Sequence, residues 1–402
     1  MRKSAPPVPL SLSGEGGLLI GVVAAALLLV TPLAAQRPAG WDAFIGTFDG
    51  YTARDSIVGA SVAVLRGGRV VARHHYGFGD RALGQRVDSN TIYHWASITK
   101  TLTAVAVMQL RDRGRLTLDD NVTRYLPELR QLHDPYGAID SVTVRMLLGH
   151  SGGFQAGTWP YGSGAAWEPF EPTRWEQLVA MMPYQRLEFR PDSRFGYSNP
   201  AFIYLARIVE QLTGDAWQTY VYKNLFAPLG LTRSYFAATP YHLAGHRSNN
   251  YAVDRDSAGR ERVVANGREF DPGITIPNGG WNAPIGDLVR WMAFLAGGTG
   301  DQAVLRRSSL AELWRARFPA AEPMATAPVD SVALSFFVLW RHGVRFIGHT
   351  GSQAGFRSFF YVNPANGAAV VAAFNTRNDV RPEESAAGFR ATRDAALGLI
   401  AR

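Results

Sequence analysis

Segments that can form β-strands lie near the two ends of this 402-residue chain, and segments that can form helices lie between them. Near the N-terminus, 57–65 is rich in β-branched residues, and a Gly-Gly turn leads to a returning strand at 69–72. Strand patterns near the C-terminus occupy 332–340, 344–347, 356–363 and 368–375. Because short strands need several partners to be stable, we expect both ends to enter one sheet. The predicted fold class is α/β (α+β): an antiparallel sheet flanked by helices, built from both chain ends, with an inserted, mainly helical region.

Apolar residues at helical spacing fill the middle of the chain. The predicted helices are 98–113, 143–148, 201–212, 217–226, 287–295 and 386–400. The stretch 240–276 is polar and Arg-rich and is left unassigned. We expect a single domain over 36–402, with an α/β part at about 42–97 and 285–402 and a helical part at about 98–284. At 47% hydrophobic residues, such a chain can bury a large core.

Residues 1–35 have the pattern of an export signal. Arg2 and Lys3 form a positive start, an apolar and glycine run follows at 18–30, and small residues precede Gln36. The sequence therefore predicts an exported protein, periplasmic or secreted. An uncleaved membrane anchor at 18–35 is the alternative, and only then would the membrane be a partner. With no Cys, the chain has no thiol nucleophile and no disulfide.

The formal net charge of +8 comes from basic residues interspersed with acidic ones. Nucleic-acid binding needs a concentrated basic patch, so we expect no nucleic-acid partner. His74 and His75 are adjacent and in a strand would face opposite sides, and no H-E-x-x-H is present. We expect no metal and no cofactor. The expected partner is a small-molecule, peptide or ester substrate, and the oligomeric state stays open.

Only three of the 41 basic residues are lysines. Arg does not release its proton in a protein, whereas a buried Lys can act as a base, so a Lys retained in such an Arg-rich chain is a candidate for chemistry. Lys100 stands three residues after Ser97, in the only Ser-x-x-Lys of the chain. Lys3 lies in the leader, and Lys223 is expected at a solvated helix position.

The spacing of Ser97 and Lys100 places both on one face of the predicted helix, about 4.5 Å apart along its axis. A Ser hydroxyl is a poor nucleophile until a base takes its proton. For Lys100 to be that base near pH 7, its pKa must fall from about 10.4 to about 7, at a cost of order 4 kcal/mol. Alternatively, a charged Lys100 lowers the pKa of another base. Tyr197 could be that base, and Asn199 could hydrogen-bond a substrate amide.

A third segment, Gly348-His349-Thr350-Gly351-Ser352, lies at the edge of the C-terminal strands. Its glycines would let a substrate backbone approach closely. Together, the three segments resemble the serine β-lactamase and penicillin-binding-protein superfamily, and most closely its class C β-lactamase, DD-peptidase and esterase branch. The matching pattern is Ser-x-x-Lys, then Tyr-x-Asn, then Lys-Thr-Gly or His-x-Gly. Two further segments support it, 147–153 and 228–231, and the resemblance covers roughly 42–380.

The resemblance implies that Ser97 is the acylated nucleophile and that Lys100 and Tyr197 share the role of base. The backbone N–H groups of Ser97 and Ser352 would form an oxyanion hole. The residues implied in substrate binding and oxyanion stabilisation are Asn199, His349, Thr350, Gly351 and Ser352. The expected function is an exported serine hydrolase that cleaves amide or ester bonds through a Ser97 acyl-enzyme.

Position 349 is His where class C β-lactamases carry Lys, and His is mostly neutral at pH 7. A peptidase or esterase is therefore expected over a class C-like β-lactamase. A slow-turnover penicillin-binding sensor or scaffold is a further alternative. The loops at 154–175 and 240–276 should shape the substrate pocket.

A competing nucleophile is Ser151, in Gly149-His150-Ser151-Gly152-Gly153, which matches the G-x-S-x-G of the α/β-hydrolase elbow. That elbow needs a strand before it and a helix after it. Here a helix is predicted before it and a loop after it, so the sequence favours Ser97.

Overall fold

The computed structural model describes residues 37–158, 172–269, 271–297, 303–320 and 329–402. The predicted leader, 1–35, and part of the predicted pocket loop 154–175 lie outside these residues. Residues 37–402 form one compact unit. Among the described residues, no helix combines the length and the apolar character that crossing a membrane requires.

The helices are α1 Trp41–Arg54, α2 Thr99–Asp112, α3 Val144–Leu148, α4 Trp175–Met181, α5 Pro200–Thr213, α6 Trp217–Val221, α7 Ala227–Leu229, α8 Ile276–Gly279, α9 Ile285–Ala296, α10 Arg307–Leu313 and α11 Pro382–Ile400. The strands are β1 Gly59–Arg66, β2 Arg69–Asp80, β3 Gln85–Arg86, β4 Ile92–His94, β5 Asn250–Arg255, β6 Glu261–Gly267, β7 Asn282–Pro284, β8 Phe318–Pro319, β9 Ser331–Val332, β10 Phe337–Arg341, β11 Val344–Gln353, β12 Phe356–Val362, β13 Ala369–Phe374 and β14 Thr376–Asn378.

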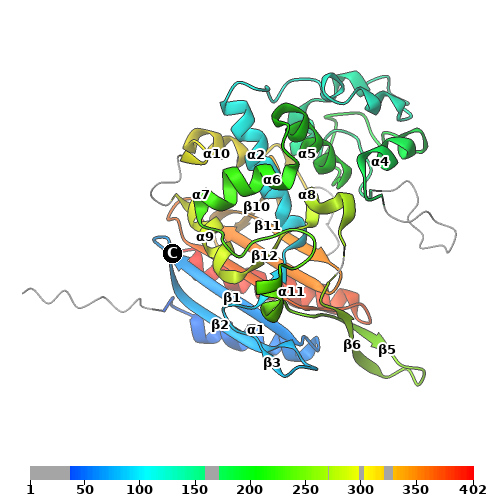
Figure 1. Ribbon diagram of the computed structural model, residues 1–402. Coiled ribbons are helices and arrows are strands. Elements are labelled where there is room, and N and C mark those ends of the chain that lie inside the picture. The colour runs from blue at the N-terminus through cyan, green and yellow to red at the C-terminus, as the bar shows by residue number, and fades with distance from the viewer. Residues whose placement is uncertain (1–36, 159–171, 270, 298–302, 321–328) are drawn as a thin grey trace, which may run out of the picture. The chain divides into compact units, whose positions relative to one another are not determined.

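A nine-stranded antiparallel sheet joins the two ends of the chain, in the order β3-β2-β1-β13-β12-β11-β10-β9-β8 (Figure 1). The two ends meet where β1 pairs with β13, from Ala60 opposite Phe374 to Leu65 opposite Ala369. Helices of the middle segment cover one face of this sheet. The predicted fold class, a helix-flanked antiparallel sheet built from both ends, is confirmed.

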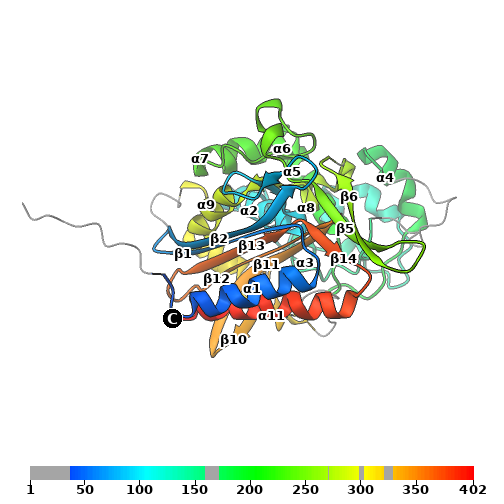
Figure 2. The ribbon, with the colours of Figure 1, turned by 90° about the horizontal axis from the view of Figure 1, so that it is seen from below.

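Side chains of the central strands alternate between two cores, as the pleat of a strand requires. In β13, Val371 and Ala373 pack into the core shared with α2, α5 and α9. Val370 and Phe374 pack into the core shared with α1 and α11. Figure 2 shows these two helices side by side along one face of the sheet. Because both faces of the sheet are covered, the central strand β13 is entirely apolar and buried.

Three strands differ clearly from their predicted bounds. Strand β2 runs on from the predicted 69–72 to Asp80. The expected strand 332–340 is two strands, β9 and β10, because the chain turns at Ser335, where φ is 69°. Strand β11 runs on from the predicted 344–347 to Gln353, so that the segment from Gly348 to Ser352 lies within it.

Several elements have no counterpart in the predictions, among them helix α1 and the β5–β6 hairpin. Helix α1 buries an aromatic stripe at helical spacing, formed by Trp41, Phe44, Phe48 and Tyr51. The unassigned stretch 240–276 contains the β5–β6 hairpin, with β14 beside it. Tyr251 and Val253 of β5 are buried, but β6 has no buried residue and carries the cross-strand ion pair Arg262–Asp254 (3.1 Å), so β6 lacks the apolar alternation that marks a half-buried strand.

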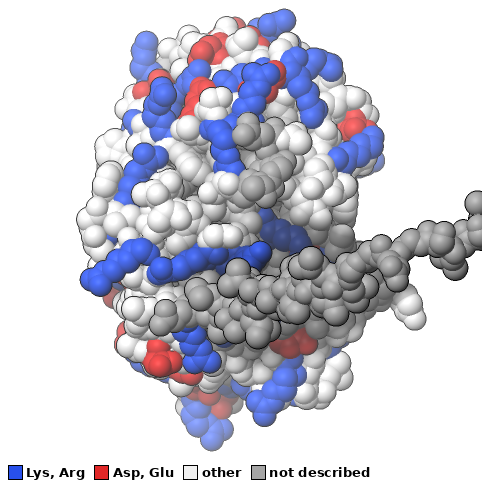
Figure 3. All heavy atoms as spheres, turned by 90° about the vertical axis from the view of Figure 1, so that its left-hand side faces the viewer, with Lys and Arg blue, Asp and Glu red and all other residues white. Residues whose placement is uncertain are grey.

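Lys and Arg side chains are distributed over the molecular face in Figure 3, with acidic side chains among them. Many of the described basic residues have an acidic neighbour, for example Arg145 with Asp119 (2.8 Å) and Arg341 with Asp330 (3.0 Å). Lys223 pairs with Asp215 at 2.6 Å and its side chain is 60% exposed, the solvated position that the sequence predicts.

Candidate active site

Ser97 is the one residue between Thr91 and Leu110 that is not buried. It lies in a 3-10 turn, Ala96–Ile98, that leads directly into α2. The turn is held from behind, because the Trp95 backbone N–H donates to Trp281 O (2.8 Å) and its indole N–H donates to Ala283 O (2.9 Å). The fold thus presents a single hydroxyl from an otherwise buried segment, at the start of a helix.

Strand β11 packs directly against this turn. A Cβ atom at Gly351 would lie 2.2 Å from Trp95 O and 2.5 Å from Ser358 Oγ, so only glycine fits there. The expected close approach at these glycines was that of a substrate backbone, but at Gly351 the turn that carries Ser97 fills the space. Gly351 therefore allows β11 to approach the turn that carries Ser97 this closely.

Lys100 is fully buried and has three oxygen neighbours. Its Nζ lies 3.2 Å from Ser97 Oγ, 2.8 Å from Asn199 Oδ1 and 2.8 Å from Asn278 O. No acidic group is among these neighbours, and burial lowers the pKa of Lys100 well below its usual value. The amine is therefore suited to accept a proton. Asn278 was not predicted, since it contributes a backbone carbonyl, which any residue type could supply.

Tyr197 and Asn199 come from the loop that precedes α5. Nζ of Lys100 lies 5.0 Å from the centre of the Tyr197 ring, and the Tyr197 side chain hydrogen-bonds that of Ser97. Burial raises the pKa of the Tyr197 phenol, and its hydrogen bond with Ser97 opposes this only in part. One of the two alternatives expected from the sequence was that a charged Lys100 lowers the pKa of Tyr197. The structure gives the opposite direction, because desolvation dominates and Lys100 itself favours its neutral form.

The predicted site residues in β11 differ in how far their side chains are buried. Ser352 is exposed, Thr350 is 6% exposed and His349 is fully buried. The His349 ring stacks on Phe337 at 4.2 Å, and its Nδ1 faces Thr350 O, the pairing of a donating N–H. Burial, then the nearby Lys100, lowers the pKa of His349 to about 3. His349 thus lies beneath the site as a neutral ring.

Ser151 lies in a setting unlike that of Ser97. It is fully buried and donates from Oγ to Asp192 Oδ1 (2.8 Å), while Asp192 also pairs with Arg317 (2.8 Å). Helix α3 precedes it, as predicted, and irregular chain follows. A hydroxyl committed to a carboxylate and closed to solvent is not placed for nucleophilic attack.

The two adjacent histidines diverge, as strand geometry requires. His74 Nε2 pairs with Asp49 Oδ1 at 2.8 Å, whereas His75 Nδ1 contacts Ser61 Oγ at 2.9 Å. Across the described ranges, no group of three His, Asp or Glu side chains is positioned to hold a metal ion.

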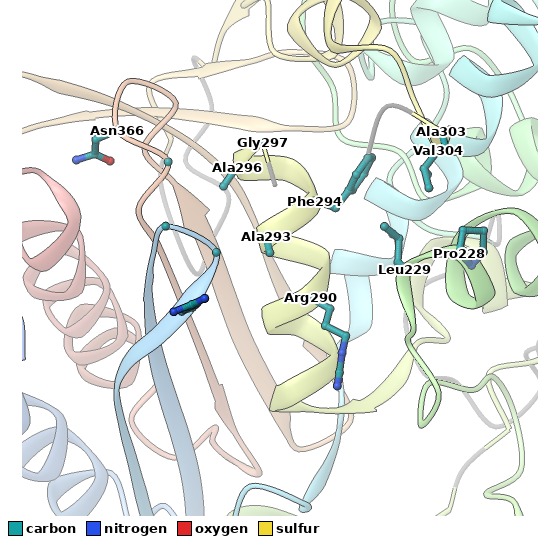
Figure 4. Close-up of a pocket in the computed structure, with 14 residues that line it drawn as sticks. Pro228, Leu229, Arg290, Ala293, Phe294, Ala296, Gly297, Ala303, Val304 and Asn366 are labelled. Atoms are coloured by element: carbon teal, nitrogen blue, oxygen red, sulfur yellow. The ribbon is translucent and has the colours of Figure 1, made fainter. Parts of the chain in front are cut away.

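A cavity of about 830 Å³ opens beside the β1–β2 turn and α9, where Arg69, Arg290 and Phe294 contribute to its lining (Figure 4). The β1–β2 turn and the β12–β13 turn, which contributes Gly367, lie at the end of the sheet away from Ser352. None of the predicted site residues lines this cavity. The chemistry of Ser97 and Lys100 is therefore separate from it.

Comparisons with known proteins give matches over most of this chain. The family model described as Beta-lactamase matches residues 44–395. Protein flp of Staphylococcus aureus (strain COL) is 24% identical over 327 residues, which are 81% of this chain and 61% of that protein. The chain thus spans about three fifths of the length of this curated relative.

Two solved structures share the fold. A D-amino acid amidase from Ochrobactrum anthropi SV3, complexed with L-phenylalanine, has a TM-score of 0.74 and 20% identity, covering 89% of this chain and 98% of that one. A class C β-lactamase has a TM-score of 0.70 and 20% identity, covering 89% and 95%. At such identities the likeness shows the fold alone.

Proposed function

We propose, from the premise that this chain belongs to the β-lactamase family of serine hydrolases, that it cleaves amide or ester bonds through an acyl-enzyme on Ser97. The observation that carries the proposal is the buried Lys100 amine 3.2 Å from the one accessible hydroxyl of its segment. In this proposal Ser97 is the nucleophile and Lys100 the main base.

The neighbours of Lys100 orient it for this role. A neutral amine has two N–H donors and one lone pair. The carbonyl oxygens of Asn199 and Asn278, both 2.8 Å away, take the two donors. The lone pair is then directed at Ser97 and can accept the hydroxyl proton as Ser97 Oγ attacks the substrate carbonyl carbon.

Tyr197 complements Lys100 as a neutral phenol. Because its pKa is raised, it keeps its proton and can donate a hydrogen bond near Ser97. In our proposal, the proton that Lys100 removes returns through the Tyr197 hydroxyl to the leaving amine or alcohol when the C–N or C–O bond breaks. Water then attacks the acyl carbonyl carbon and gives one proton to Lys100 and Tyr197. When the C–O bond to Ser97 breaks, this proton passes to Ser97 Oγ and the acid is released. The N–H groups of Ser97 and Ser352 would stabilise the oxyanion in both steps.

The neutral state of His349 supports a peptidase or esterase over a β-lactamase. A β-lactam carries a carboxylate, and a permanent cation at position 349 would attract it. A buried ring with a pKa of about 3 supplies no such charge at neutral pH. The D-amino acid amidase with the same fold makes D-aminoacyl amides a substrate class to test.

The test compares wild type with Ser97→Ala and the matched variant Ser151→Ala. Substrates are p-nitrophenyl esters, D-aminoacyl anilides and nitrocefin, and a fluorophosphonate probe reports acylation by mass. We expect ester or anilide turnover and probe mass on the peptide with Ser97, both abolished in Ser97→Ala and retained in Ser151→Ala. A wild type inert towards every substrate and the probe would disprove the proposal. Activity lost only in Ser151→Ala would transfer the role to that residue.

We also propose that the protein is exported. The proposal rests on the charged start and apolar run of residues 1–35. N-terminal sequencing of protein recovered outside the cytoplasm should begin near Gln36. A recovered chain that still begins near Met1 would favour the membrane anchor at 18–35 instead.

A further inference from the structure

His150 makes three contacts with the loop 196–198, which carries Tyr197. Its carbonyl accepts the backbone N–H of Gly196 (2.8 Å), and its Nδ1 accepts the backbone N–H of Ser198 (3.0 Å). Its ring stacks on that of Tyr197, with centroids 4.5 Å apart and planes inclined by 23°. One residue thus binds the chain on both sides of Tyr197 and covers one face of its ring.

The contacts also define the protonation state of His150. Because Nδ1 accepts an N–H, it carries no proton, so a neutral ring bears its proton on Nε2. Burial, followed by the nearby Lys100 and His349, lowers the pKa of His150 well below its usual value. The ring therefore stays neutral, and its hold on Ser198 persists, across the pH range in which hydrolases are assayed.

The backbone of His150 is specialised for this position. Its φ of 54° lies in the left-handed region, which few side chains other than Asn, Asp and His adopt readily. This conformation directs both the carbonyl and the ring towards the 196–198 loop. The loop has no regular secondary structure of its own, so its shape depends on such contacts.

We propose that His150 is a positioning residue that orients the Tyr197 hydroxyl towards Ser97. The inference rests on the proposed function, because orientation of Tyr197 matters only if Ser97 is the nucleophile. A misplacement of about 1 Å at a reacting group can reduce a rate about 100-fold. His150 acts through Tyr197, and no contact of its own with the nucleophile is needed.

The test uses two variants that distinguish the stacking of His150 on Tyr197 from its hydrogen bond with Ser198. His150→Phe keeps a ring for stacking but loses the acceptor for Ser198. His150→Asn keeps an acceptor, since Oδ1 can take the place of Nδ1, and Asn tolerates the left-handed backbone. With a substrate that the wild type turns over, we expect His150→Phe to lower kcat about 100-fold with little change in KM. We expect His150→Asn to recover most of that loss.

Rates are expressed per reactive site, counted by fluorophosphonate titration, and Tm is measured for each variant. A lower Tm with unchanged kcat per titrated site would reduce His150 to a structural role and overturn the inference. If Ser97→Ala stays active, the proposed function fails. If Ser97→Ala is inactive and His150→Phe has wild-type kcat, the positioning inference alone fails.

A double-mutant cycle gives a second test should His150→Phe not fold. If His150 acts through Tyr197, then His150→Gly, which tolerates the left-handed backbone but removes both side-chain contacts, should lower kcat less in a Tyr197→Phe background than in wild type. Equal reductions of kcat in the two backgrounds would show that His150 acts independently of Tyr197 and would overturn the inference.

Discussion

At the scale of single residues, two lysines of one chain have opposite environments. Lys223 is solvated and paired with Asp215, whereas Lys100 is fully buried without an acidic partner. The sequence distinguished them by the Ser-x-x-Lys spacing alone. It could not identify Asn278 as a partner of Lys100, because a backbone carbonyl 178 positions away has no sequence signature. Nor could it give the direction of the Tyr197 pKa, which depends on burial.

Replacing Lys100 by Met should change how stability depends on pH. The folded-state pKa of Lys100 is lowered, so between that value and about 10.4 the unfolded chain binds more protons, and wild-type stability rises with pH. Lys100→Met lacks this slope. The free energy of unfolding of the variant relative to wild type should therefore grow as pH falls from about 10 to the folded pKa, and level off below it.

Urea denaturation of both proteins at a series of pH values measures this difference. The variant should also be inactive at every pH. A difference that stays constant from pH 10 downwards would mean that Lys100 is charged in the folded protein.

At the scale of elements, most successful predictions are at an apolar stripe or a glycine turn, although helix α1 was missed despite its aromatic stripe. Helices α2, α5 and α9 lie close to their predicted ranges, and the β1–β2 and β12–β13 hairpins were anticipated. The β5–β6 hairpin was missed because β6 has no buried face, so its sequence is polar and shows no apolar alternation. The end of β11 was underestimated because glycines interrupt its β-branched pattern, although Gly348 and Gly351 are there for close packing.

Gly351→Ala should impair both catalysis and stability. Its Cβ would overlap Trp95 O at 2.2 Å, which forces β11 and the Ser97 turn apart. Overpacking of this kind costs about 1–3 kcal/mol, and the displaced nucleophile should lower kcat at least about tenfold.

The matched control is Gly286→Ala in α9, where a Cβ would meet nothing within 4 Å. Removing a helical glycine should raise stability by about 0.5–1 kcal/mol and leave kcat unchanged. Thermal unfolding and steady-state rates of the two variants distinguish these effects. A fully active Gly351→Ala would show that the turn tolerates displacement from β11.

At the scale of the whole molecule, the assembly of one sheet from both ends followed from where the strand patterns lie. The order of the strands within the sheet could not be predicted from the sequence. Apolar strands can pair in many equivalent ways, and tertiary packing selects one of them. The pairing of β1 with β13 leaves the helical middle segment as an insertion between two halves of one sheet. The family motifs give the order of the site residues along the chain, but the fold determines which of these residues lie close together.

This topology has a consequence for biosynthesis. The turn that carries Ser97 is made well before the strand packed against it, β11, and before the neighbouring strands β12 and β13. The nascent polypeptide therefore cannot complete the surroundings of Ser97 until these later strands have also left the ribosome. If the chain is translocated before it folds, the proposed hydrolytic activity first arises outside the compartment in which the chain is made.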